Sequence, residues 1–276
     1  MKLKPWNGKH MWIWMLNQTG PPVQIVSRSV DMGLSGLLVK AWDGGSSGLF
    51  LEQLMQIIKP AHDAGLFVGA WGYSYGNNIA GEVKAMEKAS KAGADWLVID
   101  AEDEYENHEG KNKALKLGIE VTRALGTSVY LGYSTFALPQ YHDAFPYQEF
   151  SSYCSVCLPQ VYWGLMSLSS EEALAMSLRG LEEFRLPVVP VGQSYGEVTP
   201  DEIIRFSRIA MANSLEGISY YNWQHATEAQ LDAVSRAAYG KDDGGWGRMP
   251  AERNAEGQPE PTKRKRKWFR GRFKPQ

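Results

Sequence analysis

Cysteine is scarce in this chain, and the features that mark several classes of protein are missing. Only two of the 276 residues are cysteine, Cys154 and Cys157, which excludes a disulfide scaffold. No apolar run reaches the roughly 18 residues that a membrane-spanning helix needs. The apolar stretch near the N-terminus, Met11–Leu16, is too short for a secretory signal peptide. We therefore expect synthesis in the cytoplasm, with neither such a signal nor a membrane span.

Motifs that mark common cofactor and nucleophile chemistry are also missing. The chain has no G-x-G-x-x-G after its first predicted strand and no G-x-S-x-G, so a dinucleotide-binding signature and a serine nucleophile elbow are excluded. Zinc would need a second ligand pair beside the single Cys-x-x-Cys, and only His225 follows a predicted strand. Asp100, Glu102 and Asp103 lack a recognised spacing for Ca²⁺ or Mg²⁺. We expect neither a metal nor a cofactor.

The regular spacing of apolar runs predicts the fold. Short β-branched or aromatic runs recur about every 30 residues, the length of a strand-plus-helix unit, with helix-like segments between them. Eight strands alternating with helices predict one (β/α)₈ TIM-type barrel of the α/β class over residues 1–240, with an open doubly wound sheet as the alternative. The predicted strands start at Met11, Gly36, Leu66, Asp95, Ser128, Val156, Pro187 and Gly217. The predicted helices cover 50–64, 79–92, 111–124, 169–185, a segment that opens at Thr199-Pro200, and 226–239.

The end of the chain has a different composition. Residues 241–276 lack periodicity and are rich in Gly, Pro and charge, which predicts a disordered linker and basic tail. The formal charge of the whole chain is only −2, but residues 262–276 hold eight bases and no acid, so the first 261 residues carry ten more acids than bases. Bases interleaved with Trp268, Phe269 and Phe273 favour binding to an anionic polymer or membrane surface over a solvated tail.

Polar and aromatic side chains follow the predicted strands, where barrel enzymes place their sites. Rings stack on the C–H faces of sugars, and amides and carboxylates bind hydroxyl groups, so this set favours a polysaccharide. Lys40 either pairs with Asp100 or caps the barrel interior. The predicted substrate-binding residues are Asn17, Lys40, Asp43, Trp71, Tyr73, Tyr133, Gln160, Tyr162, Gln193 and Trp223.

The segment LVIDAEDEYE, residues 97–106, contains the predicted catalytic pair. Side chains alternate along a strand, so Asp100 and Glu102 point the same way as Val98, toward the barrel interior and its mouth. Two carboxylates this close repel, and the pKa of one rises, which keeps a general acid protonated near neutral pH. We predict that Glu102 and Asp100 are catalytic. The acids that follow are predicted to be solvated: Asp103, Glu104 and Glu106.

The order of motifs resembles the glycoside hydrolase family 25 lysozymes, which cut the glycan of peptidoglycan. The similar segments are residues 39–44, residues 64–71, Asp100-Ala101-Glu102 and Trp223-Gln224. The resemblance implies a TIM barrel in which Glu102 is the acid/base and Asp100 positions or stabilises the reacting group. One departure is that the family's first-strand Asp is missing here, where the sequence reads MWIWMLN from Met11 to Asn17. The chitinase-like pattern of family 18 also departs, because its additional Asp corresponds to Val98.

We therefore expect a glycoside hydrolase that acts on a β-linked amino-sugar polymer such as peptidoglycan. The missing first-strand acid favours assistance by the substrate's own acetamido group, and Asp43 is the obvious substitute for that acid. The alternative is a non-catalytic carbohydrate-binding or structural barrel of a particle or coat. A third hypothesis makes the tail a nucleic-acid-binding segment, although an acidic body disfavours a broad nucleic-acid face. We expect the protein to be released, or to associate with a particle, and then to act at the cell envelope.

Overall fold

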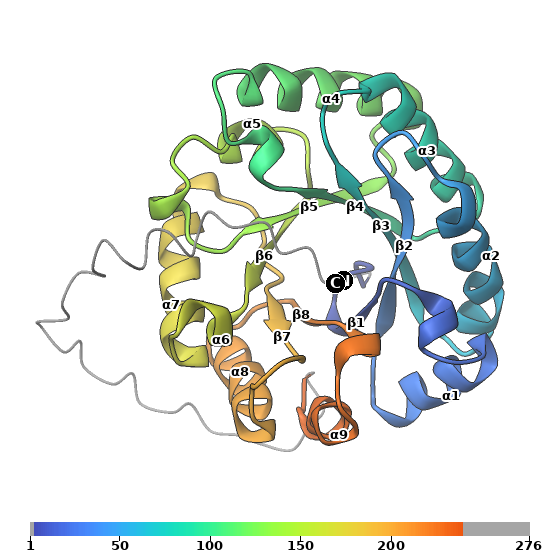
Figure 1. The fold of residues 1–276 in the computed structure, drawn as a ribbon, viewed down its shortest axis with the longest axis vertical. Coiled ribbons are helices and arrows are strands. Elements are labelled where there is room, and N and C mark those ends of the chain that lie inside the picture. The colour runs from blue at the N-terminus through green and yellow to red at the C-terminus, as the bar shows by residue number, and fades with distance from the viewer. Residues whose placement is uncertain (1–2, 240–276) are drawn as a thin grey trace, which may run out of the picture.

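Eight parallel strands form a closed barrel with helices around it in the computed structural model, which describes residues 3–239 (Figure 1). The strands follow one another in chain order, and β8 pairs with β1 to close the barrel, which confirms the predicted (β/α)₈ fold. The strands are β1 Gly8–Ile13, β2 Gly36–Asp43, β3 Phe67–Ser74, β4 Trp96–Ala101, β5 Tyr130–Phe136, β6 Val156–Val161, β7 Val191–Gln193 and β8 Gly217–Tyr221. The helices are α1 Pro22–Asp31, α2 Gly48–Asp63, α3 Ile79–Lys91, α4 Gly110–Leu125, α5 Tyr147–Ser151, α6 Trp163–Met166, α7 Ser170–Leu181, α8 Pro200–Ala212 and α9 Glu228–Arg236.

Strand β4 shows why the strands read as nearly continuous apolar runs. All six of its residues are buried, because helices cover the outer face and the barrel interior covers the other. Leu97 and Ile99 pack in the outer layer beneath the helices. Trp96 and Val98 belong to the separate core inside the barrel. The alternation predicted for β4 therefore places Asp100 on the inner face, one step above Val98.

Helices α7 and α8 begin where the sequence predicted, whereas α1, α5 and α6 were not predicted. Ser169 caps α7 and Thr199 caps α8, each in a reciprocal capping box with the Glu three residues later. Pro200 occupies the first turn of α8, where its missing N–H costs no hydrogen bond. Helix α9 starts with a capping box of the same form at Thr227.

The first strand is tied to the last helix. Lys9 lies at the start of β1 with only 2% of its surface exposed. Its Nζ donates hydrogen bonds to the carbonyl oxygens of Val234 at 2.7 Å, Ala237 at 2.8 Å and Ser235 at 3.2 Å. Because the last carbonyls of a helix lack partners within the helix, this buried ammonium group caps the end of α9.

The predicted linker and tail, residues 241–276, lie outside the described residues. Within residues 3–239, no helix combines the length and apolar character needed to cross a membrane.

Candidate active site

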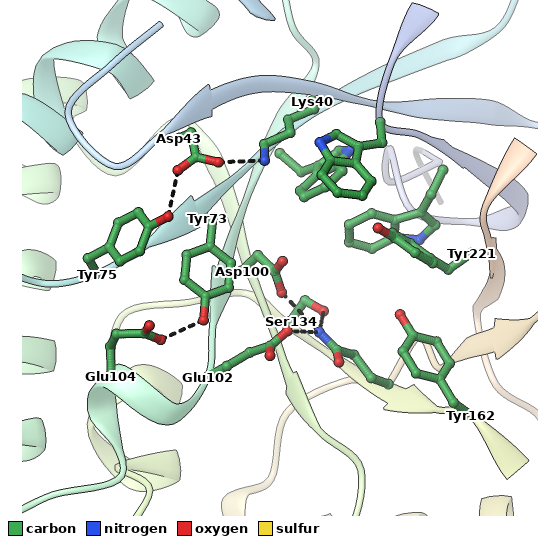
Figure 2. Close-up of a pocket in the computed structure, with 14 residues that line it drawn as sticks. Lys40, Asp43, Tyr73, Tyr75, Asp100, Glu102, Glu104, Ser134, Tyr162 and Tyr221 are labelled. Carbon is green, nitrogen blue, oxygen red and sulfur yellow. Dashed lines mark hydrogen bonds and ion pairs between the residues drawn. The ribbon is translucent and has the colours of Figure 1, made fainter. Parts of the chain in front are cut away.

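The carboxyl ends of the strands surround a cavity of about 360 Å³, a size within the range of small-molecule sites. Figure 2 shows its two sides: Asp43, Tyr73, Tyr75 and Glu104 lie on one, and Tyr162 and Tyr221 lie on the other. The lining residues are Trp12, Trp14, Lys40, Asp43, Trp71, Tyr73, Tyr75, Asp100, Glu102, Glu104, Ser134, Gln160, Tyr162 and Tyr221.

Asp100 and Glu102 both face this cavity. Asp100 is the deeper of the two, with 8% of its surface exposed, and Glu102 directly follows β4. The side chain of Gln160, on β6, bridges them: its Nε2 donates to Asp100 Oδ1 at 3.0 Å and to Glu102 Oε1 at 2.9 Å (Figure 2). The alternation of side chains along β4 therefore brings the two predicted carboxyl groups together, as the sequence indicated.

Burial sets the protonation of this pair. It raises the pKa of Glu102 to about 7; the Gln160 N–H opposes the rise, and the charges of Asp103 and Glu104 add to it. Burial, followed by the charge of Glu102, raises the pKa of Asp100 well above its usual value, while Lys40 and Gln160 lower it. The proton that the two groups hold near neutral pH therefore belongs to the pair.

Lys40 forms its ion pair with Asp43. The Nζ lies 2.7 Å from Asp43 Oδ2, and the Tyr75 hydroxyl donates to Asp43 Oδ1 at 2.8 Å. The ammonium group also lies within 5.2 Å of the ring centroids of Trp14 and Trp71, a cation–π arrangement. Asp43 thus reaches the cavity, as expected for a substitute acid, but both of its oxygens already accept hydrogen bonds.

Glu104 lines the cavity, although the sequence predicted a solvated side chain. Its Oε2 accepts a 2.5 Å hydrogen bond from the hydroxyl of Tyr73. Glu106 is also bound within the protein, because its Oε2 lies 3.1 Å from Nδ1 of His142. The solvated-loop prediction was wrong for these two acids because residues 103–105 form a 3₁₀ turn, and the side chains of Glu104 and Glu106 find partners on other parts of the chain.

The aromatic wall is built from rings that contact one another. The ring centroids of Trp12 and Trp71 are 5.2 Å apart in an edge-to-face arrangement, and that of Tyr221 lies 6.0 Å from Trp12. Tyr162 extends the wall, with its centroid 5.9 Å from Tyr221. The peptide bond between Tyr221 and Asn222 is cis. The wall of packed aromatic rings suits the apolar face of a ring-shaped ligand.

Two buried polar residues fix the loops that carry these groups. Gln53, on α2, donates from Nε2 to the carbonyl oxygens of Trp14 at 2.8 Å and Lys40 at 2.7 Å. Glu82, on α3, is fully buried and accepts hydrogen bonds from the Ser74 hydroxyl at 2.5 Å and from the Gly76 N–H at 3.0 Å. The ends of β1, β2 and β3 are therefore held from the helix layer beneath them.

Four predicted binding residues lie away from the cavity. Asn17 is exposed in the turn after β1, where Trp12 and Trp14 face the cavity instead. Tyr133 points outward and stacks on Phe150, with 5.3 Å between the ring centroids, because it neighbours the inward-facing Ser134 on β5.

The other two are Gln193 and Trp223. The Gln193 side chain is hydrogen-bonded to backbone groups: its Oε1 accepts from the Gly164 N–H at 3.0 Å, and its Nε2 donates to the Tyr195 carbonyl at 3.1 Å. Trp223 packs in the outer core, because the Asn222 side chain caps a turn at residues 223–225 that directs it away from the barrel axis. Its neighbour Gln224 does reach the site indirectly, since its Oε1 accepts from the Trp14 N–H at 3.1 Å.

Six lining residues were absent from the predicted set: Trp12, Trp14, Tyr75, Glu104, Ser134 and Tyr221. Alternation along β5 does not find Ser134 by itself; the register of β5 against β4 does, because Ser134 is the partner of Asp100. Alternation does pair Trp12 with Trp14 on one face of the first strand. Glu104 carries no comparable signal, since it lies beyond the end of β4.

We found no group of three or more His, Cys, Asp or Glu side chains arranged to hold a metal within residues 3–239. Cys154 and Cys157 are buried free thiols. Burial raises the pKa of Cys157 to about 12, and it raises that of Cys154 as well. Both groups are therefore unreactive thiols in the neutral pH range.

No family model and no curated protein sequence matches the chain. A chitinase from Chromobacterium violaceum has a similar structure, with 10% sequence identity and a TM-score of 0.64 over 84% of this chain and 98% of that one. Active domain 2 of a chitinase from Pyrococcus furiosus is similar at 10% identity and a TM-score of 0.66, over 85% and 94%. The spore cortex-lytic enzyme SleL of Bacillus cereus is similar at 10% identity and 0.63, over 86% and 75%. At such identities the similarity shows the barrel fold.

Proposed function

We propose that this protein is a glycoside hydrolase that cleaves a β-linked amino-sugar polymer such as peptidoglycan or chitin. The observation that carries the proposal is the carboxyl pair at the end of β4, Asp100 and Glu102, placed inside a cavity with an aromatic wall. Glycosidases need a carboxyl group that is still protonated near neutral pH, and burial raises the pKa of Glu102 to about 7.

Glu102 is the proposed acid because it lies nearer the mouth of the cavity than Asp100. It gives its proton to the glycosidic oxygen as the bond to the anomeric carbon breaks, and the resulting carboxylate then takes a proton from the attacking water. Asp100 stabilises the positive charge that develops at the sugar, directly or through the acetamido group of the substrate. Asp43 is a poor nucleophile in this scheme because Lys40 and Tyr75 occupy its oxygens.

The substrate class rests on the wall and on two resemblances. Trp12, Trp71 and Tyr221 offer ring faces to a sugar, and Glu104, Ser134 and the Lys40 side offer polar partners for its hydroxyl and amide groups. The motif resemblance to family 25 lysozymes supports peptidoglycan. Two structural neighbours named as chitinases and one named as a spore cortex-lytic enzyme support amino-sugar polymers in general.

The test is the release of new reducing ends from peptidoglycan and from chitin oligosaccharides by the purified full chain. Glu102→Gln should lower the rate by about 10²–10⁴-fold while the circular dichroism spectrum stays the same. Glu106→Gln is the matched control, because Glu106 binds His142 outside the cavity. Equal activity of Glu102→Gln and the wild type would overturn the assignment of the acid.

A non-catalytic carbohydrate-binding barrel is the second candidate. It is favoured by β1, which brings Trp12 and Trp14 to the cavity and no carboxylate. Glycan binding in calorimetry, with no reducing ends released between pH 4 and pH 9, would establish this function in place of the first. In either case, eight bases in residues 262–276 support attachment to an anionic envelope polymer or membrane surface. Weaker, less salt-dependent binding after deletion of these residues tests that attachment.

A further inference from the structure

Gln160 has an unusual place in the cavity for a residue expected to bind substrate. The two N–H bonds of a primary amide can serve two acceptors. The Nε2 atom of Gln160 lies 3.0 Å from Asp100 Oδ1 and 2.9 Å from Glu102 Oε1. Ser134 Oγ lies further away, at 3.4 Å. The donor capacity of this nitrogen is therefore directed at the carboxyl pair.

The hydroxyl groups of Tyr162 and Tyr221 lie in the same cavity, but in the described part of the chain neither is hydrogen-bonded to Asp100 or Glu102. Below Asp100 the barrel interior is apolar, with Val98, Leu38 and Leu158 in one buried cluster. The nearby cation, Lys40, is hydrogen-bonded to Asp43. Within residues 3–239, Gln160 makes all the hydrogen bonds to the carboxyl oxygens of Asp100 and Glu102. Buried carboxyl groups without such a donor would be free to rotate and to stay neutral.

The direction of the hydrogen bonds decides where a proton can sit. An amide nitrogen donates and cannot accept, so Asp100 Oδ1 and Glu102 Oε1 are occupied as acceptors. An unprotonated carboxyl oxygen is the better acceptor for this amide N–H, so the arrangement favours a proton on the other oxygen of either group, Asp100 Oδ2 or Glu102 Oε2.

We propose that Gln160 is the positioning residue of the carboxyl pair, which holds both groups in one orientation and favours the Oε2 atom of Glu102 as the carrier of the proton that Glu102 donates. This inference rests on the proposed glycosidase function for its consequence, but the orientation itself is a property of the free protein. Gln160 takes no proton and forms no bond with the substrate in this role. It acts through the two carboxyl groups.

The position of Gln160 on a strand of the barrel suits a positioning role. It lies on β6, two strands along the barrel from β4, and β6 is hydrogen-bonded to β5 and β7 within the closed barrel. Residues on strands hold their geometry better than residues on loops. Gln193, on the adjacent β7, is the comparison: it is also a glutamine on a barrel strand, but its side chain is buried and binds only backbone groups of Gly164 and Tyr195.

The experiment measures carboxyl titration directly, without an assay of activity. Side-chain carboxyl ¹³C signals of the labelled full chain, assigned with Asp100→Asn and Glu102→Gln, are followed from pH 3 to pH 10. Gln160→Met removes the donor and keeps the volume of the side chain. The hydrogen bonds from Gln160 lower the pKa of both carboxyl groups, because they favour the ionised form. Without them, the titration of both groups should move up by about one pH unit. Gln193→Met should leave it in place.

A second variant and a second readout complete the test. Gln160→Asn, one methylene shorter, withdraws the same nitrogen from both carboxyl groups, so it should also move both titrations up, and it replaces Gln160→Met if that variant fails to fold. Both limbs of the pH profile of kcat/KM should move up with Gln160→Met. Titrations that coincide with those of the wild type would overturn the positioning role. Absence of glycan cleavage by the wild type would instead overturn the proposed function, and the titrations would still decide the role of Gln160.

Discussion

The ammonium group of Lys40 binds the carboxylate of Asp43, three residues further along the chain, at a distance of 2.7 Å. The sequence had left open whether Lys40 pairs with Asp100 or caps the barrel interior. In the structure it lies on the cavity wall, where its charge lowers the pKa of Asp100 and the charge of Asp43 raises it. The two members of this ion pair therefore act on the pKa of Asp100 in opposite directions.

Substitutions at Lys40 and Asp43 should move the acidic limb of the pH profile in opposite directions. Lys40→Met removes a charge that lowers the pKa of Asp100, so the acidic limb of kcat/KM should move to higher pH. Asp43→Asn removes a charge that raises this pKa, so the limb should move to lower pH. Profiles with glycan oligosaccharides check this, and shifts of the same sign in both variants would refute it.

Glu102→Gln should stabilise the fold at alkaline pH. The ordinary pKa of Glu102 is 4.5 and burial raises it to about 7 in the folded state, so between these values the folded state binds more protons than the unfolded state. The free energy of unfolding contributed by this group therefore falls as the pH rises through that window.

Relative to the wild type, Glu102→Gln should gain roughly 1–3 kcal/mol at pH 8 and little at pH 4. Urea unfolding at the two pH values measures the difference. Glu106→Gln serves as the comparison at both. A gain that is equal at pH 4 and pH 8 would mean that the charge of Glu102 is not the cause.

Cleavage should depend on the N-acetyl group of the substrate. No carboxylate from β1 lines the cavity, and Asp43 and Glu104 are held by Lys40, Tyr75 and Tyr73, so we expect the substrate's acetamido oxygen to attack the anomeric carbon. Fully deacetylated oligosaccharides should then be cleaved at least about 100-fold more slowly, and NMR should show product with retained configuration. Inverted product would exclude this mechanism.

Lys9→Met should destabilise the barrel without touching the cavity. The variant leaves the carbonyl oxygens of Val234 and Ala237 buried without the donor that caps α9, and we expect a loss of about 2–4 kcal/mol in the free energy of unfolding. Lys59→Met is the control, because Lys59 is an exposed lysine paired with Asp63 on the surface of α2. Similar stability losses for the two variants would contradict the capping role.

The sequence predicted the architecture well because its signals are local and periodic. The regular spacing of apolar runs indicates eight strands, and alternation along β4 places Asp100 and Glu102 beside each other on the inner face. Alternation alone fails where neighbouring strands must be aligned. The choice between Tyr133 and Ser134 depends on the register of β5 against β4, in which Ser134 opposes Asp100.

Other parts of the site depend on the path of the chain after each strand. Trp223 leaves the barrel axis because Asn222 caps the following turn, and Gln193 is taken up by backbone groups of a neighbouring loop. The bridge from Gln160 to both carboxyl groups joins residues about 60 positions apart. No local pattern in the sequence reports such a contact.

The pairing of β1 with β8 has a consequence for biosynthesis. Trp12 on β1 and Tyr221, the last residue of β8, belong to the same wall of the cavity, so this wall cannot exist until the ribosome has released residue 221. Nascent chains that carry Asp100, Glu102 and Gln160 but not β8 would lack the Tyr221 side of this wall. The activity that we propose would therefore depend on completion of the barrel.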